Sequence, residues 1–524
     1  MEKILIKKGR LFKDADGIKI ALIACTAAML AISLILTFTV SDYYIFNRWA
    51  EYGALFCISQ WVKKAGIVLL TLAVFFGCKS CADSAKYLLP VFIVISLCLF
   101  GNFFNATPVI AEGDTNAEIF FKVNSGFPKW LNITLFVLQS ALMLACCALL
   151  FLRDEESPVK LKSLIAVPLS LAVSMPLNIF ENFFDINKIP QDSFLRFYNF
   201  TFWHFLAICV LVGVTVGLYY FLKKKDKATQ DKYLAALAVT LLLQYHSKDS
   251  LLLSDGYNVY NTVIAALPLF ICNIGVYVAC LSVIFKKRPL YAMSFFVHAV
   301  GALTVFVYFG KNDMSNYGIF CSFSILYFCL THCILFALCV LPSALGHYKF
   351  KIKDCIIPLI YYFIVIIISS IASTLVSDAS TKWVANDGVT HLIYDGVYVQ
   401  GLGADGTAFM KPNFAFTQTN PLPFDVPNII PLGGAFAYIN LFYVILVYIA
   451  YVCLFFAFYG AYRVFLITRK AVLAAVQKGK EKKLAQGQPN VLPTPAEAPE
   501  AELTYTETAV TDDADTVEEK TDKE

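Results

Sequence analysis

The chain has 524 residues, of which 58% are hydrophobic and only 15% are charged, and its net charge is +4. A soluble protein of this length carries about a quarter charged residues, so the composition excludes a soluble globular protein and predicts an all-α, polytopic membrane protein. The small net charge gives no reason to expect a nucleic-acid partner. Nearly all of the 16 Cys lie in apolar runs, which indicates core residues and not a disulfide framework.

About twelve apolar runs are long enough to cross a bilayer as helices. The run at 17–40 is too long for the core of a signal peptide and is expected to remain as a helix. The runs at 64–78 and 231–247 are the shortest. The approximate limits of the full set are 17–40, 64–78, 86–105, 131–152, 160–182, 200–222, 231–247, 259–286, 290–310, 318–342, 355–377 and 435–466.

Basic residues predict how this helix bundle is oriented. Residues 1–13 are basic and are expected to face the cytoplasm, and every second junction after them is also basic. The five Trp fall on the opposite, outer side, several of them at helix ends where indole prefers to lie. This pattern predicts a multi-pass protein of the cell (cytoplasmic) membrane with both termini cytoplasmic. The basic junctions are 78–86, 153–162, 223–227, 286–288 and 347–353.

The longest outer loop covers residues 377–434 and is rich in Gly, Pro, Asn and Asp. Within it, Asp395-Gly396 separates two short β-prone runs, which predicts a hairpin with a type I′ turn. A loop of this length suits either a lid over an outward-facing cavity or a surface decoration, and the sequence leaves both open.

The chain divides into three regions. Residues 1–190 are expected to form an N-terminal membrane region of five helices, and residues 195–466 a seven-helix membrane domain that includes the long outer loop. Residues 467–524 are first basic and then rich in Pro, Thr and acidic residues. This composition predicts a disordered cytoplasmic tail.

The run at 261–285 is the best candidate for chemistry. Read as one helix, it is kinked near its middle by Pro268, which lacks a backbone donor, and Cys272 and Asn273 follow one turn later. Membrane helices tolerate proline and buried Cys often only fills space, so a structural interpretation stays open. Cys78 and Cys81 form a CxxC pair with no second pair nearby to complete a zinc site. We therefore expect neither a metal nor a cofactor.

Two histidines, His298 and His332, lie well inside apolar runs, where an imidazole usually faces the bundle interior. By helical rise, Cys272 lies roughly 20 Å and His332 about 21 Å from the outer ends of their helices, so the two side chains are expected at one level. A thiol beside an imidazole is the Cys–His arrangement of nucleophilic catalysis, because a thiol in apolar surroundings needs a nearby base. These helices contain no Asp or Glu, so Asn273, Thr331 or a backbone carbonyl would orient the imidazole.

Each histidine also has a structural interpretation. His332 and His298 are each suited to an interhelical hydrogen bond in a membrane bundle. His204, next to Trp203 at an outer helix end, is most simply an interfacial residue.

The segment Leu267-Pro-Leu-Phe-Ile-Cys272 resembles the Leu-Pro-Leu-x-x-Cys signature of the YwaF-type bacterial integral-membrane family. Five further positions or segments resemble the family in the same order, and the resemblance covers about residues 195–466. The family's intramembrane histidine is matched by His332. The other matching segments are His204, 287–291, 301–303 and 413–416, which begins with Asn413.

The YwaF-type family is similar to a eukaryotic transmembrane acyltransferase that moves fatty acyl groups between phospholipids. The resemblance implies a lipid-linked acyltransferase or thioesterase that works through a thioester on Cys272. His332 would be the base and Asn273 the orienting residue or oxyanion donor, with His298, His204 and Asn413 as secondary candidates. Membrane phospholipids or a lipid-linked substrate would be the partners. The alternatives are a transporter or flippase for a lipid or small neutral solute and a non-catalytic membrane scaffold.

The N-terminal helices contain an echo of the same signature. Leu89-Pro-Val-Phe-Ile-Val94 repeats most of the letters of Leu267 to Cys272, and the two segments would run in opposite directions, as in inverted repeats. A short apolar echo also arises by chance. If the echo reflects a duplication, Val94 replaces the thiol and the N-terminal half is chemically silent.

Overall fold

The computed structural model describes the greater part of the chain. Among the described residues the protein is helical apart from one small sheet, and nine helices are long and apolar enough to span a membrane. The protein is therefore an all-α, multi-pass membrane protein, as its composition predicts. Both termini lie outside the described residues. These are 17–39, 53–105, 129–153, 164–177, 179, 189–190, 192–254, 268–307, 319–378, 382–383, 398–402, 408–412, 427, 429–432 and 440–487.

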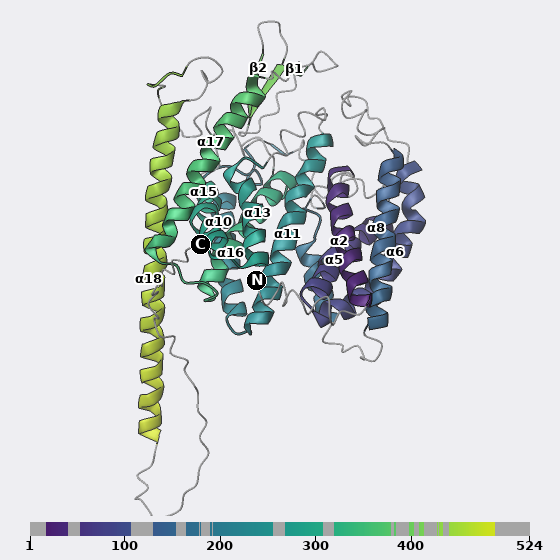
Figure 1. Cartoon of the computed structure of the whole chain (residues 1–524), viewed down its shortest axis with the longest axis horizontal. Helices are drawn as coiled ribbons and strands as arrows, with labels where there is room; N and C mark the ends of the chain where they lie inside the picture. The colour runs from purple at the N-terminus through teal and green to yellow at the C-terminus, as the bar shows by residue number, and fades with distance from the viewer. Residues whose placement is uncertain are drawn as a thin grey trace, which may run out of the picture. The chain divides into compact units, whose positions relative to one another are not determined.

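The described residues of the N-terminal region form five helices, and those labelled in Figure 1 are drawn in purple and blue. The five helices are α2 (Gly17–Thr39), α5 (Ala54–Phe75), α6 (Lys79–Asn105), α8 (Lys129–Arg153) and α9 (Ala166–Val173). The first four lie side by side, with α2 against α8, α5 against α6, and α6 against α8 (Figure 1). The short α9 packs on α5 and α6.

Three of these helices differ from the predicted runs. Helix α6 begins at Lys79, seven residues before the predicted start at 86. The predicted run at 64–78 begins about ten residues too late, because α5 includes two lysines, Lys63 and Lys64, that the bundle buries. The run at 160–182 holds only the eight-residue α9, which is too short to span a bilayer. The described helix ends at Val173, two residues before Met175. Met175 precedes Pro176, and a residue that precedes a proline disfavours the helical backbone.

The C-terminal region follows the predicted runs more closely. Three of its elements form one span, in which a single π-helical segment, η4, joins α14 to α15. With this span counted once, each of the predicted runs contains one described helix. The elements are α10 (Phe202–Leu222), α11 (Lys227–Ser254), α13 (Ile271–Phe285), α14 (Arg288–Met293), η4 (Ser294–His298), α15 (Ala299–Val307), α16 (Phe323–Ala344), η5 (Ile352–Cys355), α17 (Ile356–Asp378) and α18 (Leu441–Gly487).

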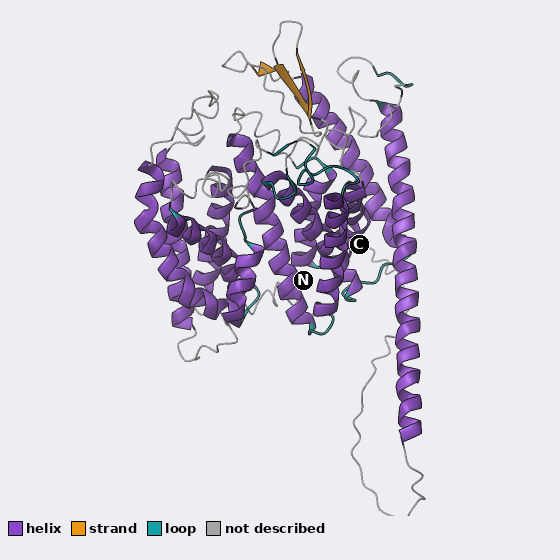
Figure 2. Cartoon of the chain, turned by 180° about the vertical axis from the view of Figure 1, so that it is seen from behind, coloured by secondary structure: helices purple, strands orange, loops and turns teal. Residues whose placement is uncertain are grey.

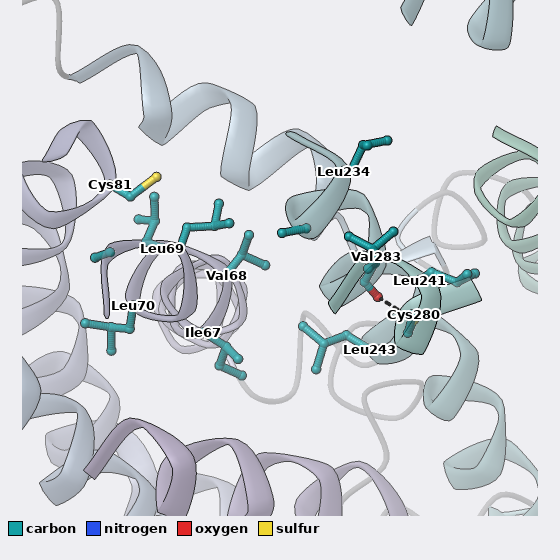
Figure 3. Packing of buried hydrophobic residues seen from close by; sticks show 14 of the residues in the cluster. Ile67, Val68, Leu69, Leu70, Cys81, Leu234, Leu241, Leu243, Cys280 and Val283 are labelled. Carbon is teal, nitrogen blue, oxygen red and sulfur yellow. Dashed lines mark hydrogen bonds between the residues drawn. The ribbon is translucent and has the colours of Figure 1, made fainter. Parts of the chain in front are cut away.

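The largest hydrophobic cluster joins the two regions. Helix α11 packs against α2 and α5 on one side and against α13 and α16 on the other. Figure 3 shows part of this cluster, with Ile67 to Leu70 of α5, Leu241 and Leu243 of α11, and Val283 of α13. The Cys280 thiol also donates to the Ala238 carbonyl at 3.3 Å, as drawn there. Residues 1–461 form one compact unit, and the second unit begins at Tyr462, within α18.

The segment between α17 and α18 contains a small antiparallel sheet, orange in Figure 2, next to the end of α17. Its strands are β1 (Lys382–Trp383), β2 (Tyr398–Leu402) and β3 (Ala408–Pro412), in the order β1-β3-β2. The predicted turn at Asp395-Gly396 lies outside the described residues. Strand β2 pairs with the downstream β3, so the described hairpin joins residues that follow the predicted one.

The run that carries the Leu-Pro-Leu-x-x-Cys signature is not one continuous helix in its described part. Pro268, Leu269 and Phe270 are non-helical, and α13 begins only at Ile271. Phe270 has an extended backbone, with φ −78° and ψ 144°. Pro268 therefore lies three residues before the start of α13, and the part of the predicted kinked run that precedes it lies outside the described residues.

Candidate functional site

Neighbouring helices hold the backbone of the signature at the start of α13. The Ser369 hydroxyl of α17 donates to the Leu269 carbonyl at 2.9 Å. His298 Nδ1 of η4 lies 3.0 Å from the Ile271 carbonyl oxygen. Because these carbonyls are bound on both sides of Phe270, the helix start is fixed by tertiary contacts as well as by the proline.

Cys272 is the second residue of α13 and lies in its first turn. The first backbone N–H groups of a helix have no intrahelical partner, and they place partial positive charge at that end. An anion such as a thiolate or an oxyanion is stabilised there. Cys272 is half-buried and joins the largest hydrophobic cluster from its edge, so this end of α13 combines an apolar setting with unused donors.

A glycine on α15 leaves room beside the thiol. A Cβ atom at Gly301 would lie 3.9 Å from Cys272 Sγ and 3.5 Å from the Tyr451 hydroxyl. The Thr304 hydroxyl, one turn further along α15, donates to the Gly301 carbonyl at 3.0 Å and also lies beside the Tyr451 hydroxyl. The thiol therefore shares a small space with a tyrosine hydroxyl from α18.

Tyr451 was missed by the sequence reasoning. The available signal is a group of tyrosines in otherwise apolar helices: Tyr361 and Tyr362 on α17, and Tyr448 and Tyr451 on α18. Three of them gather in one cluster, where the Tyr362 ring stacks on those of Tyr448 and Tyr451. A buried phenol needs a partner for its hydroxyl, so a tyrosine in a spanning helix deserves the same scrutiny as a histidine.

His298 lies close to Cys272 in the fold, but its ring bonds to the backbone of the preceding residue, Ile271. A carbonyl only accepts, so Nδ1 must donate to Ile271, and in a neutral ring Nε2 then accepts from the Tyr361 hydroxyl at 3.0 Å. Gly275 makes this possible, because a Cβ atom there would lie 2.8 Å from Nδ1. His298 thus orients the helix start, and its basic nitrogen is already bound.

His332 lies on α16 in contact with aromatic rings. Its Nδ1 donates to the Phe328 carbonyl one turn back, at 2.8 Å, which leaves the basic lone pair on Nε2. Its ring contacts those of Phe328 and Phe306, with centroids 4.2 and 6.4 Å away. Phe306 follows Gly301 by five residues, about 7.5 Å along α15. Cys272 and His332 therefore flank one helix, and their direct approach stays a prediction.

His204 has a structural role in the fold. Its Nδ1 accepts the Phe200 N–H and its Nε2 donates to the Phe306 carbonyl, each at 2.8 Å. The ring is almost fully buried and not exposed at a membrane boundary. It ties the loop before α10 to the end of α15. Phe200, which has a left-handed backbone with φ 63°, is stabilised by this bond.

The remaining candidates are less defined. Asn273 is the third residue of α13 and is half-buried, turned by about a hundred degrees from Cys272. Asn413 lies outside the described residues. Within the described part of the chain, no group of three or more His, Cys, Asp or Glu side chains is arranged to hold a metal ion.

Ion pairs fix the other end of α13. Lys286, which follows the helix in a left-handed conformation, pairs with Asp231 of α11. His347 bonds to the Gln230 side chain at 2.7 Å, and burial lowers the pKa of its imidazole, although the nearby Asp231 acts in the opposite direction. These contacts join the loops that follow α13 and α16 to the start of α11.

Comparison with known proteins identifies the region that carries these residues. Residues 197–456 match the model of the TMEM164 family. These limits are close to the predicted limits of 195–466. The matching family is TMEM164, and the predicted YwaF name is not the one found. No curated protein and no solved structure was found to match. The matched region contains Cys272, His298, His332 and Tyr451, and it excludes the N-terminal helices. Residues 197–456 of this multi-pass membrane protein are therefore similar to the TMEM164 family.

Proposed function

We propose that the protein is a lipid-linked acyltransferase or thioesterase in which Cys272 carries the acyl group as a thioester. The observation that carries the proposal is the position of Cys272 in the first turn of a helix that begins among spanning helices. TMEM164 is a eukaryotic membrane acyltransferase-like family, and the YwaF-type signature ends on the same cysteine. The proposal includes both termini in the cytoplasm and residence in the cell membrane.

The chemistry has two balanced steps. The Cys272 thiol attacks the ester carbonyl of a phospholipid, the ester C–O bond breaks, and the thiol proton passes through a base to the leaving oxygen. A hydroxyl of a second lipid, or water, then attacks the thioester carbon and restores the thiol. His332 has the tautomer that a base requires, since its proton is on Nδ1.

The oxyanion of each tetrahedral intermediate needs donors near the thiol. Backbone N–H groups of the first turn of α13 meet this need, because they have no intrahelical partner. The Asn273 amide, one residue on, is a second source, and the Tyr451 hydroxyl near Sγ is a third. The first two of these sources belong to the start of α13, which Ser369 and His298 hold in place.

The test is acyl labelling of the purified protein. With a phospholipid that is radiolabelled in its acyl chain, the protein should gain a hydroxylamine-sensitive label. Cys272→Ala should abolish the label, and His332→Gln should slow its formation or turnover. Cys280→Ala is the matched control: it removes a buried thiol from the same helix, two turns on, and should keep the label. Equal labelling of the wild type and Cys272→Ala would refute the proposal.

A transporter or flippase is the second candidate, and one observation favours it. A stretch of non-helical backbone, Pro268 to Phe270, lies against spanning helices, and interrupted helices line the substrate sites of many transporters. This function predicts lipid movement across proteoliposomes in the absence of any acyl label. A scaffold predicts neither, with Cys272→Ala silent in both assays.

A further inference from the structure

Helix α5 buries a lysine within a membrane-spanning segment. Lys63 is only 3% exposed, and its helix is one of the nine candidate spans among the described residues. Its ammonium donates to the Ser140 hydroxyl of α8 at 2.9 Å and lies 3.7 Å from the centre of the Phe136 ring. None of the ion pairs formed by described residues includes Lys63. Ionisable groups at such positions are expensive and usually functional.

Among the described residues, the Lys63 ammonium has a single hydrogen-bond acceptor, the Ser140 hydroxyl. An ammonium has three N–H groups, and Ser140 accepts one of them. Two amides of the same bundle already donate to serine oxygens: Gln139 to Ser33 at 2.9 Å, and Gln60 to Ser96 at 2.6 Å. These two serines already accept from other side chains, and an anion with several acceptor sites would complement the two remaining N–H groups of the ammonium.

A polar face leads from one end of the bundle to Lys63. Helices α5 and α8 are parallel, since Lys63 meets Ser140 and Gly66 faces Met143, three residues further on each helix. Asn132, two turns before Ser140, is buried on the same side of α8. By helical rise, Lys63 lies about 14 Å from the start of α5 and Ser140 about 16 Å from the start of α8. A lipid headgroup that enters the bundle at the starts of α5 and α8 would therefore reach the ammonium at a depth of about 14 to 16 Å.

The space around the lysine limits the size of the headgroup. One turn beyond Lys63, a Cβ atom on Gly66 would lie 2.4 Å from a methyl group of Leu89 and 2.9 Å from that of Met143. The bundle is closed there, which disfavours a bulky phosphodiester headgroup. A single ammonium calls for a single negative charge. A carboxylate on an apolar tail has both properties and is available from the lipid phase.

We propose that Lys63 binds the carboxylate of a long-chain fatty acid, with the acyl tail among the apolar side chains of α5, α6 and α8. The site lies outside the region that matches the TMEM164 family and shares no residue with the Cys272 site. The inference is therefore independent of the proposed acyl transfer.

The test is photolabelling of the full-length protein in nanodiscs with a diazirine-bearing palmitate. Labelling should be saturable and should fall at least tenfold in Lys63→Met, while Lys63→Arg keeps most of it. Lys64→Met is the matched control, because this buried neighbour points about a hundred degrees away on α5 and its loss should change labelling less than twofold. Removal of an unpaired buried charge should also leave the melting temperature of Lys63→Met at or above that of the wild type.

Competition separates the ligand classes. Unlabelled oleate should displace the probe, whereas phosphatidylglycerol at the same concentration should not. Full labelling of Lys63→Met, or equal displacement by phosphatidylglycerol, would overturn the proposal. So would a loss of labelling accompanied by a lower melting temperature in both Lys63→Met and Lys63→Arg, because that result assigns the lysine a purely structural role.

Discussion

Two segments with nearly the same letters adopt different backbones in this protein. In Leu89 to Val94, Pro90 lies inside the continuous helix α6. In Leu267 to Cys272, the described residues remain non-helical through Phe270, and α13 starts only at Ile271. A proline can therefore be tolerated in one membrane helix and precede the start of another, and the local sequence does not decide which.

The neighbours of each segment explain the difference. Leu89 is fully buried, and its methyl groups face Gly66. The Leu269 carbonyl has the Ser369 hydroxyl as a partner, and the Ile271 carbonyl has His298. As a result the last residue of the first segment, Val94, is a half-exposed residue in mid-helix, while Cys272 occupies a first turn. The two segments are therefore similar in sequence but not in backbone conformation.

Replacement of each of the two prolines by alanine should give the largest difference in stability. Pro90→Ala restores a donor inside α6 and should raise the free energy of unfolding by up to about 3 kcal/mol, the difference between proline and alanine in a helix interior. Pro268→Ala lies outside a helix and should give no such gain. Melting temperatures in detergent would measure both. Equal stabilisation by the two changes would mean that Pro268 also interrupts a helix.

The two crowded glycines should give the next largest effect. Gly275→Ala forces a methyl group against the His298 ring, which two hydrogen bonds hold in place, and should cost about 2 kcal/mol. Gly66→Ala meets the ends of flexible Leu89 and Met143 side chains, which can turn away, and should cost about 1 kcal/mol. Acyl labelling of Cys272 should fall only in Gly275→Ala. A fall in both variants would show that the label reports stability alone.

Loss of the serine contact should give the smallest effect. Ser369→Ala leaves the Leu269 carbonyl without its donor and should cost about 1 kcal/mol. It should also change the rate at which a small maleimide modifies Cys272, since the start of α13 becomes less fixed. Thr215→Ala is the control, because that hydroxyl bonds only within its own helix, to the Leu211 carbonyl. The same change in the modification rate in both variants would show that Ser369 does not specifically hold the start of α13.

Most of the fold could be predicted from the sequence, since each predicted apolar run holds a described helix. The errors have identifiable causes. The start of α5 was missed because two lysines interrupt the apolar pattern, and only the packed bundle reveals that Lys63 is buried. The start of α13 was missed because Ser369 and His298, which hold it, are distant in sequence.

The candidate site was predictable only in part. The signature pointed to Cys272, and the intramembrane position pointed to His298. No local pattern indicates that His298 would bind the Ile271 carbonyl and Tyr361. Tyr451 comes from the last helix and meets Cys272 only through the gap left by Gly301. Such pairings depend on which helix faces which, and a single sequence does not encode that in any local pattern.

The π-helical segment η4 makes the site depend on residue number along one helix. The Ala299 N–H bonds to the Ser294 carbonyl, five residues back, so this turn contains one residue more than an α-helical turn. Everything after it is rotated by about a hundred degrees relative to an uninterrupted helix. Deletion of one residue within Ser294–His298 would leave composition and hydrophobicity nearly unchanged. It would nevertheless turn the Gly301 face away from the cysteine, so the geometry of the site depends on residue spacing as much as on residue identity.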